Sequence, residues 1–275
     1  MTREPFKQVD ESFLAIQEWS DPVSYVTIGF TTRQGGYSDE NFSTMNLGLH
    51  VKDDTNTVIK NREKIASSTP LSLSNWVFAE QTHSNHIKKV TSQDTGKGIH
   101  SYDKGVLDCD GLYTNEKGIM LSLCFADCVP LYFFSAEKKC IGLAHAGWQG
   151  TVKDISGEMI KQWQLEGIEP QSVKVAIGPS IEACCYVVDD RVISAINELS
   201  LPRDHMSYEM ISQGQYKLDL KQLNKNLLIR AGVKEENILT SNYCTSCDAD
   251  KFFSHRRDHG KTGRMLSFIG LGLEA

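Results

Sequence analysis

Long apolar runs, internal repeats and low-complexity tracts are all missing from this sequence. No apolar stretch approaches the roughly 18 residues that a membrane-spanning helix requires. Residues 1–5 (MTREP) lack the basic-then-apolar pattern of a secretory signal peptide. We therefore expect a cytoplasmic protein that has no membrane partner.

Positive charge is also in short supply. Lysine and arginine total 29 residues against 35 aspartates and glutamates, which gives a formal net charge of −6. Nucleic-acid binders usually display a basic face, so this balance argues against nucleic acid as a partner. An acidic total can still contain a local basic pocket, and a small anionic substrate stays compatible with it. The composition leaves the oligomeric state open.

Cysteines are plentiful, but the usual context for disulfides is absent. A chain of 275 residues can bury a core without them, and nothing indicates an oxidising compartment. The eight cysteines are Cys109, Cys124, Cys128, Cys140, Cys184, Cys185, Cys244 and Cys247. A structural zinc site at Cys244-x-x-Cys247 would need a second pair of suitable spacing, which the adjacent Cys184-Cys185 lacks. We expect structural thiols there.

Strand-like runs alternate with helical patterns along the chain. Runs rich in β-branched and aromatic residues lie at Tyr25–Phe30, Trp76–Ala79, Ile119–Leu123, Val129–Phe134, Cys140–Ala144, Val173–Ile177 and Met265–Ile269. Apolar residues at helical spacing predict helices over 152–163, 192–199 and 220–228. This interleaving predicts an α/β (mixed α+β) fold, in which helices cover mixed sheets. We expect one compact domain over residues 23–275, after an N-terminal lead-in of residues 1–22.

The stretch that ends in His145 predicts a β-hairpin. Two apolar strands flank a polar connection at residues 135–139. If the turn centres on Glu137, Val129 faces His145 and Cys128 lies beside it. Neighbouring Cα atoms of antiparallel strands are about 4.5–5.5 Å apart, so the Cys128 and His145 side chains can reach one point.

A third candidate ligand follows the strand-like run at 76–79. The sequence there is Gln-Thr-His-Ser-Asn-His, so either His83 or His86 could join Cys128 and His145. One cysteine with two histidines is a three-ligand set that leaves the fourth position of zinc open for water or substrate.

The same atoms also permit a metal-free interpretation. Cys128 could act as a thiolate nucleophile, with His145 as its general base and Asp127 or Asp110 as an orienting acid. Spacing alone does not separate this interpretation from the metal site. Both place chemistry at one point of the fold.

Several segments could bind an anion. Small residues follow His145, and we expect Thr151 to cap a helix that begins at Val152, where exposed amides favour anions; a simple glycine turn explains the segment equally well. Arg33, in a glycine-flanked loop, could grip phosphate through its planar guanidinium or be solvated. The same alternatives apply to a late basic cluster of Arg256, Arg257, Lys261 and Arg264.

Nine short motifs occur in order along the chain. They are TTRQGG (31–36), NLG (46–48), QTH (81–83), DCDG (108–111), ADCVP (126–130), AHAGW (144–148), IGPSI (177–181), CCY (184–186) and FSHRRD (253–258). Together they resemble the YfiH/YlmD family, the laccase-domain proteins now regarded as purine nucleoside phosphorylases. The resemblance runs from Phe30 to Ile269, nearly the whole chain.

The resemblance implies a zinc enzyme that phosphorolyses adenosine, inosine, guanosine and S-methyl-5′-thioadenosine and also deaminates adenosine. Purine nucleosides and phosphate would be its partners. It places the metal ligands on His83, Cys128 and His145, and so selects His83 over His86. It also implies a fold related to the deamidase domain of a bacterial toxin, which has a Cys–His site.

We expect the catalytic residues to be His83, Cys128, His145 and Asp127. Substrate contacts are expected from Arg33, Asn46, Asp110, Gln149 and Arg256. One departure from the family pattern puts specificity in doubt, because Val187 stands where the family usually has glutamate. The preferred purine, the phosphate-binding residues and the physiological role do not follow from the sequence.

Two other functions use the same residues. The older family name suggests a copper-dependent polyphenol oxidase, but a multicopper site wants close pairs such as His-x-His. The histidines are His50, His83, His86, His100, His145, His205, His255 and His259, which contain no such pair, so we favour zinc over copper. The other alternative is a metal-free cysteine hydrolase that uses Cys128 and His145.

Overall fold

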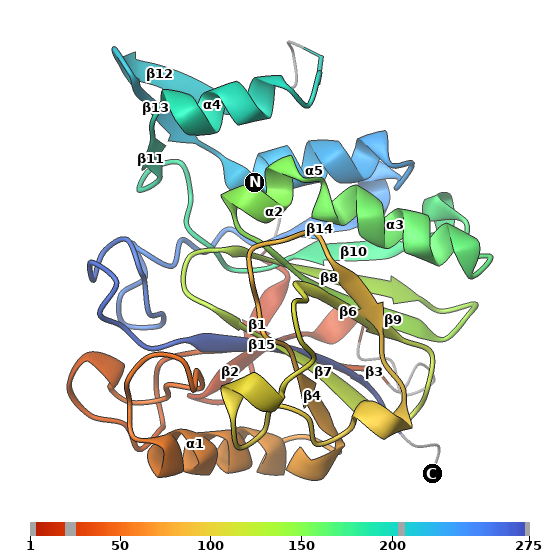
Figure 1. The fold of residues 1–275 in the computed structure, drawn as a ribbon, viewed down its shortest axis with the longest axis vertical. Helices are drawn as coiled ribbons and strands as arrows, with labels where there is room; N and C mark the ends of the chain where they lie inside the picture. Colours follow the sequence, from red (N-terminus) through yellow and green to blue (C-terminus); the bar gives the residue numbers. More distant parts are fainter. Residues whose placement is uncertain (1–3, 20–25, 203–206, 273–275) are drawn as a thin grey trace.

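Two six-stranded sheets stack face to face in the computed structural model, which describes residues 4–19, 26–202 and 207–272 (Figure 1). The first has the order β1 (Phe6–Gln8), β2 (Phe13–Ile16), β3 (Val26–Thr31), β15 (Met265–Leu271), β7 (Ile119–Phe125), β4 (Trp76–Phe78). The second has the order β14 (Ile238–Thr240), β10 (Lys174–Ile177), β8 (Val129–Ser135), β9 (Cys140–Ala146), β6 (Gly111–Thr114), β5 (Ile87–Lys89). Each sheet contains parallel and antiparallel pairs.

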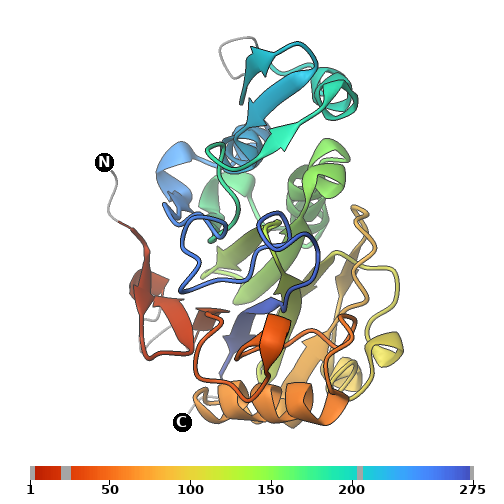
Figure 2. The ribbon, with the colours of Figure 1, turned by 90° about the vertical axis from the view of Figure 1, so that its left-hand side faces the viewer.

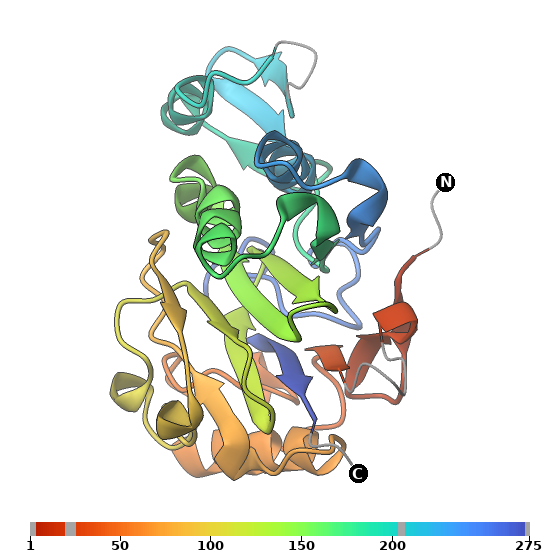
Figure 3. The same cartoon turned by 90° about the vertical axis from the view of Figure 1, so that its right-hand side faces the viewer.

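Helices cover the outer face of each sheet (Figures 1 and 3). The first sheet packs on α1 (Thr55–Ser67), and the second on α2 (Trp148–Val152), α3 (Ile155–Leu165) and α5 (Leu220–Arg230). One apolar cluster fills the space between the sheets, and two others fill the space between each sheet and its helices. Central strands such as β7 and β9 are therefore buried on both faces, which is why they read as continuous apolar runs.

A small third sheet extends the molecule beyond α5 (Figure 1). Its order is β11 (Val187–Val188), β13 (Gln215–Leu218), β12 (Tyr208–Ser212), and α4 (Asp190–Asn197) packs on it through the apolar stripe Val192, Ile193 and Ile196. Short 3-10 helices occur at Gln17–Trp19, Glu40–Phe42, Leu73–Asn75, Ser92–Asp94, Tyr102–Lys104, Pro170–Ser172 and Glu235–Asn237. Among the described residues no helix is both long and apolar enough to cross a membrane.

The expected fold class is confirmed, as are the expected strands to within two residues at each described end. Tyr25, the expected start of one strand, and the expected boundary between residues 22 and 23 lie outside the described residues. The N-terminal segment is part of the first sheet, because β1 pairs with β2 and β2 with β3 at its edge (Figure 2).

Two features of the helices differ from expectation. The chain enters α2 already at Trp148, with Gly147 rather than Thr151 at its N-cap. The helix then breaks at Asp154, whose φ of 58° lies in the left-handed region and whose side chain caps α3. Helix α1 was not expected, because polar Asn61 and Arg62 occupy buried positions on its inner face and interrupt the apolar periodicity.

The hairpin of β8 and β9 forms, but its register is one residue away from the expected one. Pro130, not Val129, pairs with His145. The connection has four residues, Ala136 to Lys139, and Lys139 adopts a left-handed φ of 48°. An even-numbered connection excludes a turn centred on a single residue, which is the reason for the shift.

Candidate active site

Two crossings between the main sheets and the end of one strand meet at one place. His83 lies in the crossing from β4 to β5, and Cys128 in the crossing from β7 to β8. His145 lies near the end of β9, which is the hairpin partner of β8. One sulfur and one ring nitrogen from each histidine all lie within 4.8 Å of one another. The structure thus brings together the three side chains that the sequence singled out.

Local backbone geometry makes this convergence possible. His83 and Asp127 have φ values of 59° and 82°, which turn the chain sharply beside each ligand. Gly147 passes close to both ligands, since a Cβ atom there would lie 3.0 Å from the Cys128 sulfur and 3.2 Å from a ring carbon of His83. Glycine at this position leaves the room that the site needs.

Asp110 orients His145 from behind. Its Oδ1 lies 2.8 Å from Nδ1 of His145, and its Oδ2 accepts hydrogen bonds from the Ser84 amide at 2.7 Å and the Thr82 amide at 3.0 Å. The ring therefore presents its other nitrogen to the site, and the loop that carries His83 is held by the same carboxylate. Asp110 is completely buried and does not line the cavity, so it supports a ligand where we expected a substrate contact.

The charges of these groups favour a thiolate. Burial raises the pKa of Cys128, but the charge and hydrogen bonds of His145 and then His83 outweigh it and lower the pKa to about 6. Burial lowers the pKa of His145, but the Cys128 charge and the hydrogen bond to Asp110 raise it to about 10. For Asp110 the contacts with His145 and Ser84 outweigh burial and hold the pKa well below its usual range. A thiolate is both the metal-binding and the nucleophilic form of cysteine.

The donor set fits a metal ion. It offers one soft sulfur and two imidazole nitrogens, a combination that zinc and copper both accept. Within the described part of the chain no fourth protein donor joins this group. A three-donor set with an open position is typical of catalytic rather than structural zinc.

A cavity of about 520 Å³ opens over the three donors. This volume is in the range of small-molecule binding sites. Its lining includes several residues that the sequence did not single out, namely His50, Gln81, Tyr102, Trp148, Ile181, Tyr186, Leu220 and His255. They come from separate loops and helices. Five of them stand in the short motifs of the sequence, but nothing in their spacing marks them as residues of one cavity.

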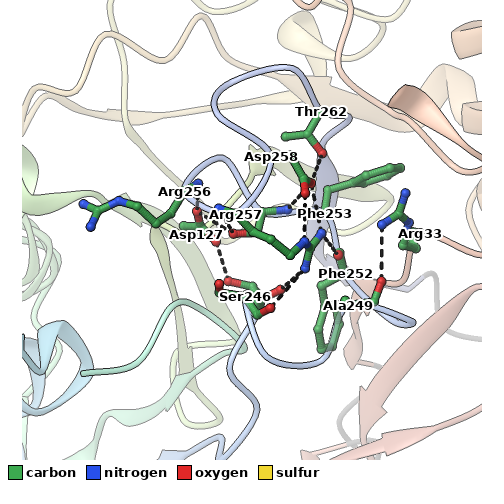
Figure 4. A network of polar contacts seen from close by, with 12 residues as sticks. Arg33, Asp127, Ser246, Ala249, Phe252, Phe253, Arg256, Arg257, Asp258 and Thr262 are labelled. Carbon is green, nitrogen blue, oxygen red and sulfur yellow. Dashed lines mark hydrogen bonds and ion pairs between the residues drawn. The ribbon is translucent and has the colours of Figure 1, made fainter. Parts of the chain in front are cut away.

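The expected substrate residues divide into two groups. Gln149 and Arg256 line the cavity. Arg33 does not, because its guanidinium donates to the carbonyls of Ser43 at 3.0 Å and Ala249 at 3.2 Å and stacks on Phe253 (Figure 4).

Asn46 is also absent from the cavity lining. Its buried side-chain oxygen accepts a hydrogen bond from the Arg264 amide at 2.9 Å. Arg33 and Asn46 thus hold loops together at the positions where we expected substrate contacts.

Asp127 uses both carboxylate oxygens to hold the C-terminal loop segment, which we define as residues 241–264. Oδ1 accepts from the Thr245 hydroxyl at 2.7 Å, and Oδ2 from the Ser254 hydroxyl at 3.0 Å and the Arg256 amide at 2.7 Å (Figure 4). Asp127 also lines the cavity next to Cys128, and its expected catalytic role stays a prediction.

The late basic cluster is split by the fold. Arg256 and Arg264 line the cavity, whereas Lys261 does not. Arg257 forms a bidentate ion pair with Asp258, with N–O distances of 2.8 and 2.9 Å (Figure 4). This pair stabilises the loop segment internally. The cavity therefore has a basic wall in an acidic chain.

His50 belongs to the same wall as Arg264. A Cβ atom on Gly48 would lie 2.7 Å from Cγ of Arg264 and 3.3 Å from a ring carbon of His50, so glycine permits both to approach. The ring of His50 is exposed at the cavity. Burial of its other sides and the charges of Arg264 and Arg62 lower the pKa of His50 to about 4. The ring is neutral at neutral pH and can donate or accept one hydrogen bond.

The fold and the site define the class of protein. It is an α/β protein in which one cysteine and two histidines form a metal-type centre at the base of a cavity, and arginines line one wall of that cavity. The family described as multi-copper polyphenol oxidoreductase laccase matches residues 27–272. The chain belongs to this family, which includes the YlmD and YfiH proteins.

Relatives in the family are similar over their whole length. A Bacillus subtilis (strain 168) protein named purine nucleoside phosphorylase YlmD is 48% identical over 274 residues, which is 98% of each chain. The crystal structure of YlmD from Geobacillus stearothermophilus superposes with a TM-score of 0.95 at 45% identity, covering 98% of this chain and 100% of that one. The crystal structure of the hypothetical protein YfiH from Bacillus licheniformis gives 0.94 at 46% identity with the same coverage.

Proposed function

We propose that this chain is a zinc-dependent purine nucleoside phosphorylase, acting on adenosine, inosine, guanosine and S-methyl-5′-thioadenosine. The observation that carries the proposal is the three-donor site below a cavity with a basic wall. The 48% identity to a protein named purine nucleoside phosphorylase supports it. In this reaction a phosphate oxygen attacks C1′ of the ribose as the bond to the purine breaks, and the purine nitrogen takes up a proton.

His83, Cys128 and His145 would hold the zinc ion. When bound there, zinc supplies Lewis acidity that polarises a substrate atom or a water molecule. Asp110 keeps the ring of His145 in the ligating orientation. Zinc is favoured over copper because a copper oxidase needs several neighbouring histidine groups, and within the described residues the only histidine-containing donor group is this one.

The basic wall would hold phosphate. Arg264 and Arg256 offer guanidinium donors at the cavity surface, and the neutral ring of His50 adds a hydrogen bond. A phosphate held there would stabilise the positive charge that develops on the ribose as the glycosidic bond breaks. Tyr186 and Trp148 provide aromatic surface for the purine, and the Tyr186 ring lies next to the Arg256 guanidinium, 4.9 Å from its centroid to the guanidinium carbon.

We also propose deamination of adenosine in the same cavity. In this reaction water adds to purine C6 and the amino group leaves as ammonia, so the purine must turn its C6 edge toward the three donors. The ribose and phosphate contacts then matter little, so the two activities should respond differently to changes in the basic wall.

One observation favours a second candidate function. The pKa of Cys128 is lowered to about 6 beside a histidine that is itself held by an aspartate, which is the arrangement of a cysteine hydrolase. Such an enzyme would need no metal and no phosphate. Its turnover would depend on Cys128 and His145 and would persist after removal of the metal.

The deciding experiment follows adenosine with and without phosphate at measured metal content. We expect adenine release that requires phosphate, and inosine formation that does not. His83→Ala and Cys128→Ala should abolish both, and the zinc ion of this three-donor site should be lost in parallel. Adenine release without phosphate, or full turnover by protein stripped of metal, would refute the phosphorylase; oxidation of phenols with copper bound would support the oxidase instead.

A further inference from the structure

Four other cysteines, remote from the three donors in sequence, also converge. Cys184 and Cys185 lie between β10 and β11, and Cys244 and Cys247 lie in the C-terminal loop segment. Their four sulfur atoms all lie within 4.8 Å of one another.

The sulfur separations match those of a tetrahedral thiolate site. Cys184 lies 3.7 Å from Cys185, 3.7 Å from Cys244 and 3.6 Å from Cys247, and Cys185 lies 3.4 Å from Cys247. Four sulfurs bound to one zinc ion at about 2.3 Å stand about 3.8 Å apart from each other. A disulfide would require about 2.05 Å, so no pair is at bonding distance.

Two tight turns aim these side chains at one point. In the first, the Cys185 amide donates to the Glu182 carbonyl at 2.9 Å, which bends the chain so that two adjacent cysteines serve one centre. In the second, the Asp248 amide donates to the Cys244 carbonyl at 2.9 Å, which closes the Cys-x-x-Cys turn. The adjacent spacing of Cys184 and Cys185, which argued against a ligand set in the sequence, is therefore no obstacle.

Backbone contacts hold the two turns against each other. Ser180 and Cys244 form a β-bridge, and the Thr245 amide donates to the Ser180 carbonyl at 3.1 Å. The Glu182 amide lies 3.5 Å from the Cys244 sulfur, the kind of N–H···S contact that accompanies metal-bound thiolates. The donors are thus preorganised from both sides.

We propose that Cys184, Cys185, Cys244 and Cys247 bind one zinc ion in a structural site that is separate from the His83–Cys128–His145 centre. Four protein donors leave no open position, which is the mark of a structural zinc. Thiolates select zinc over the hard ions magnesium, calcium and manganese. This inference concerns metal content and stability, and does not depend on the proposed phosphorylase activity.

The site would brace the wall of the cavity. Cys185 is followed directly by Tyr186, which lines the cavity, and Cys244 by Thr245, which holds Asp127 beside Cys128. Zinc would join the segment of Cys185 and Tyr186 to the segment of Cys244 and Thr245, which otherwise contact each other through a few backbone hydrogen bonds. Its loss should loosen nucleoside binding more than it slows the chemical step.

Zinc counting under reducing conditions tests the proposal. Wild-type protein should contain about two zinc ions per chain, and both the His83→Ala variant and the Cys184→Ser/Cys247→Ser variant about one. Cys184 and Cys247 are exposed, so serine there leaves no buried cavity. Asp250→Asn is the control and should keep both ions, because Asp250 is exposed in the same loop segment and its carboxylate pairs with Lys251.

Two further readouts identify the donors. Cobalt(II) loaded into the His83→Ala variant should show the sulfur-to-metal charge-transfer absorption of a tetrahedral four-thiolate site, and the double serine variant should not. Thermal unfolding of the double serine variant should begin at a lower temperature than that of the control.

Three results would overturn the proposal. The first is a zinc content of one per chain that falls to zero in His83→Ala. The second is a disulfide among the four cysteines, found by mass spectrometry after alkylation without reduction. The third is iron in place of zinc. All three are measurements of metal content or of sulfur chemistry, whereas the phosphorylase proposal is tested by phosphate-dependent turnover, so the failures of the two proposals are distinguishable.

Discussion

The buried carboxylate of Asp110 fixes the orientation of the His145 ring in the three-donor site. Asp110 has no exposed surface. One of its carboxylate oxygens contacts the His145 ring, and the other accepts a hydrogen bond from the loop that carries His83. Its negative charge is balanced by hydrogen-bond donors on every side, which is the condition for keeping such a group buried. The positions of two of the three donors therefore depend on one buried group that lies outside the cavity.

Replacing this carboxylate should weaken metal binding while the donors stay in place. Asp110→Asn keeps the shape but removes the charge that steadies the His145 ring. We expect zinc affinity to fall by about 10–100-fold, as is usual when such a supporting partner is lost. Competition titration with a chromophoric chelator measures it. Asp108→Asn is the control, because the Asp108 carboxylate is exposed and pairs with His86; equal affinities for both variants would contradict the assigned role.

The basic wall gives a second prediction at the residue scale. Arg264→Gln should raise the KM for phosphate at least about tenfold, because a charge-assisted hydrogen bond contributes about 1.5–3 kcal/mol and 1.4 kcal/mol is a factor of ten. Adenosine deamination should change much less. Lys261→Gln removes a nearby charge that does not line the cavity and should leave both activities unchanged. An unaltered phosphate KM in Arg264→Gln would remove this residue from the phosphate site.

At the scale of elements, the C-terminal loop segment forms one wall of the site almost without regular secondary structure. Arg257 donates to the carbonyls of Thr245 at 3.0 Å and Phe252 at 3.0 Å, and Asp258 holds Arg257 and the Thr262 hydroxyl (Figure 4). Side-chain bonds to backbone thus replace the ladder of a sheet. Such a segment depends on charge in a way that β7 and β9 do not.

This dependence predicts a loss of stability in acid. Burial raises the pKa of Asp258, but Arg257 and Thr262 outweigh it and hold the pKa below its usual value. A carboxyl with a depressed folded-state pKa contributes its full stability above the unfolded value of about 3.9 and loses it as the pH falls through the folded value. We expect the free energy of unfolding to decline below about pH 4, and to decline less steeply in Asp258→Asn.

Urea unfolding across this pH range measures the effect. Asp39→Asn serves as the control, since Asp39 is exposed and makes no side-chain capping bond. It should follow the wild-type curve. Identical acid limbs for wild type and Asp258→Asn would show that this ion pair contributes nothing to the folded state.

The elements also show how far sequence patterns reach. Strands buried on both faces, such as β7, β8 and β9, were predictable because their apolar runs have no other stable location. Helix α1 was not, because the hydrogen-bond partners of its buried Asn61 and Arg62 come from distant loops and include the carbonyls of Asn46 and Leu47. The hairpin register followed from the conformation of Lys139, which no periodicity reports.

For the whole molecule, the N-terminal segment is part of the core. Phe6, Leu14 and Ile16 have no exposed surface and belong to the cluster between the two main sheets. Phe6 also packs its ring against Tyr132 of the second sheet, with centroids 5.7 Å apart. The segment therefore couples the edge of one sheet to the face of the other.

Truncating Phe6 should therefore destabilise the entire fold. Phe6→Ala removes a fully buried aromatic side chain, and we expect a loss of about 3–5 kcal/mol in the free energy of unfolding. Val9→Ala is the control, since Val9 lies in the same segment but is 54% exposed. Urea unfolding compares them. A loss below about 1 kcal/mol for Phe6→Ala would mean that the segment is only loosely attached.

The sequence by itself determined the fold class, the central strands and the two donors Cys128 and His145. For the third donor it left His83 and His86 open, and the family resemblance selected His83. These depend on short-range patterns: apolar runs, one hairpin and a motif after a strand. The tertiary structure alone decided which arginines reach the cavity, that Asp110 rather than Asp127 orients His145, and that four cysteines meet. Those outcomes depend on loops far apart in the sequence packing at one end of two stacked sheets, and local patterns carry no information about that packing.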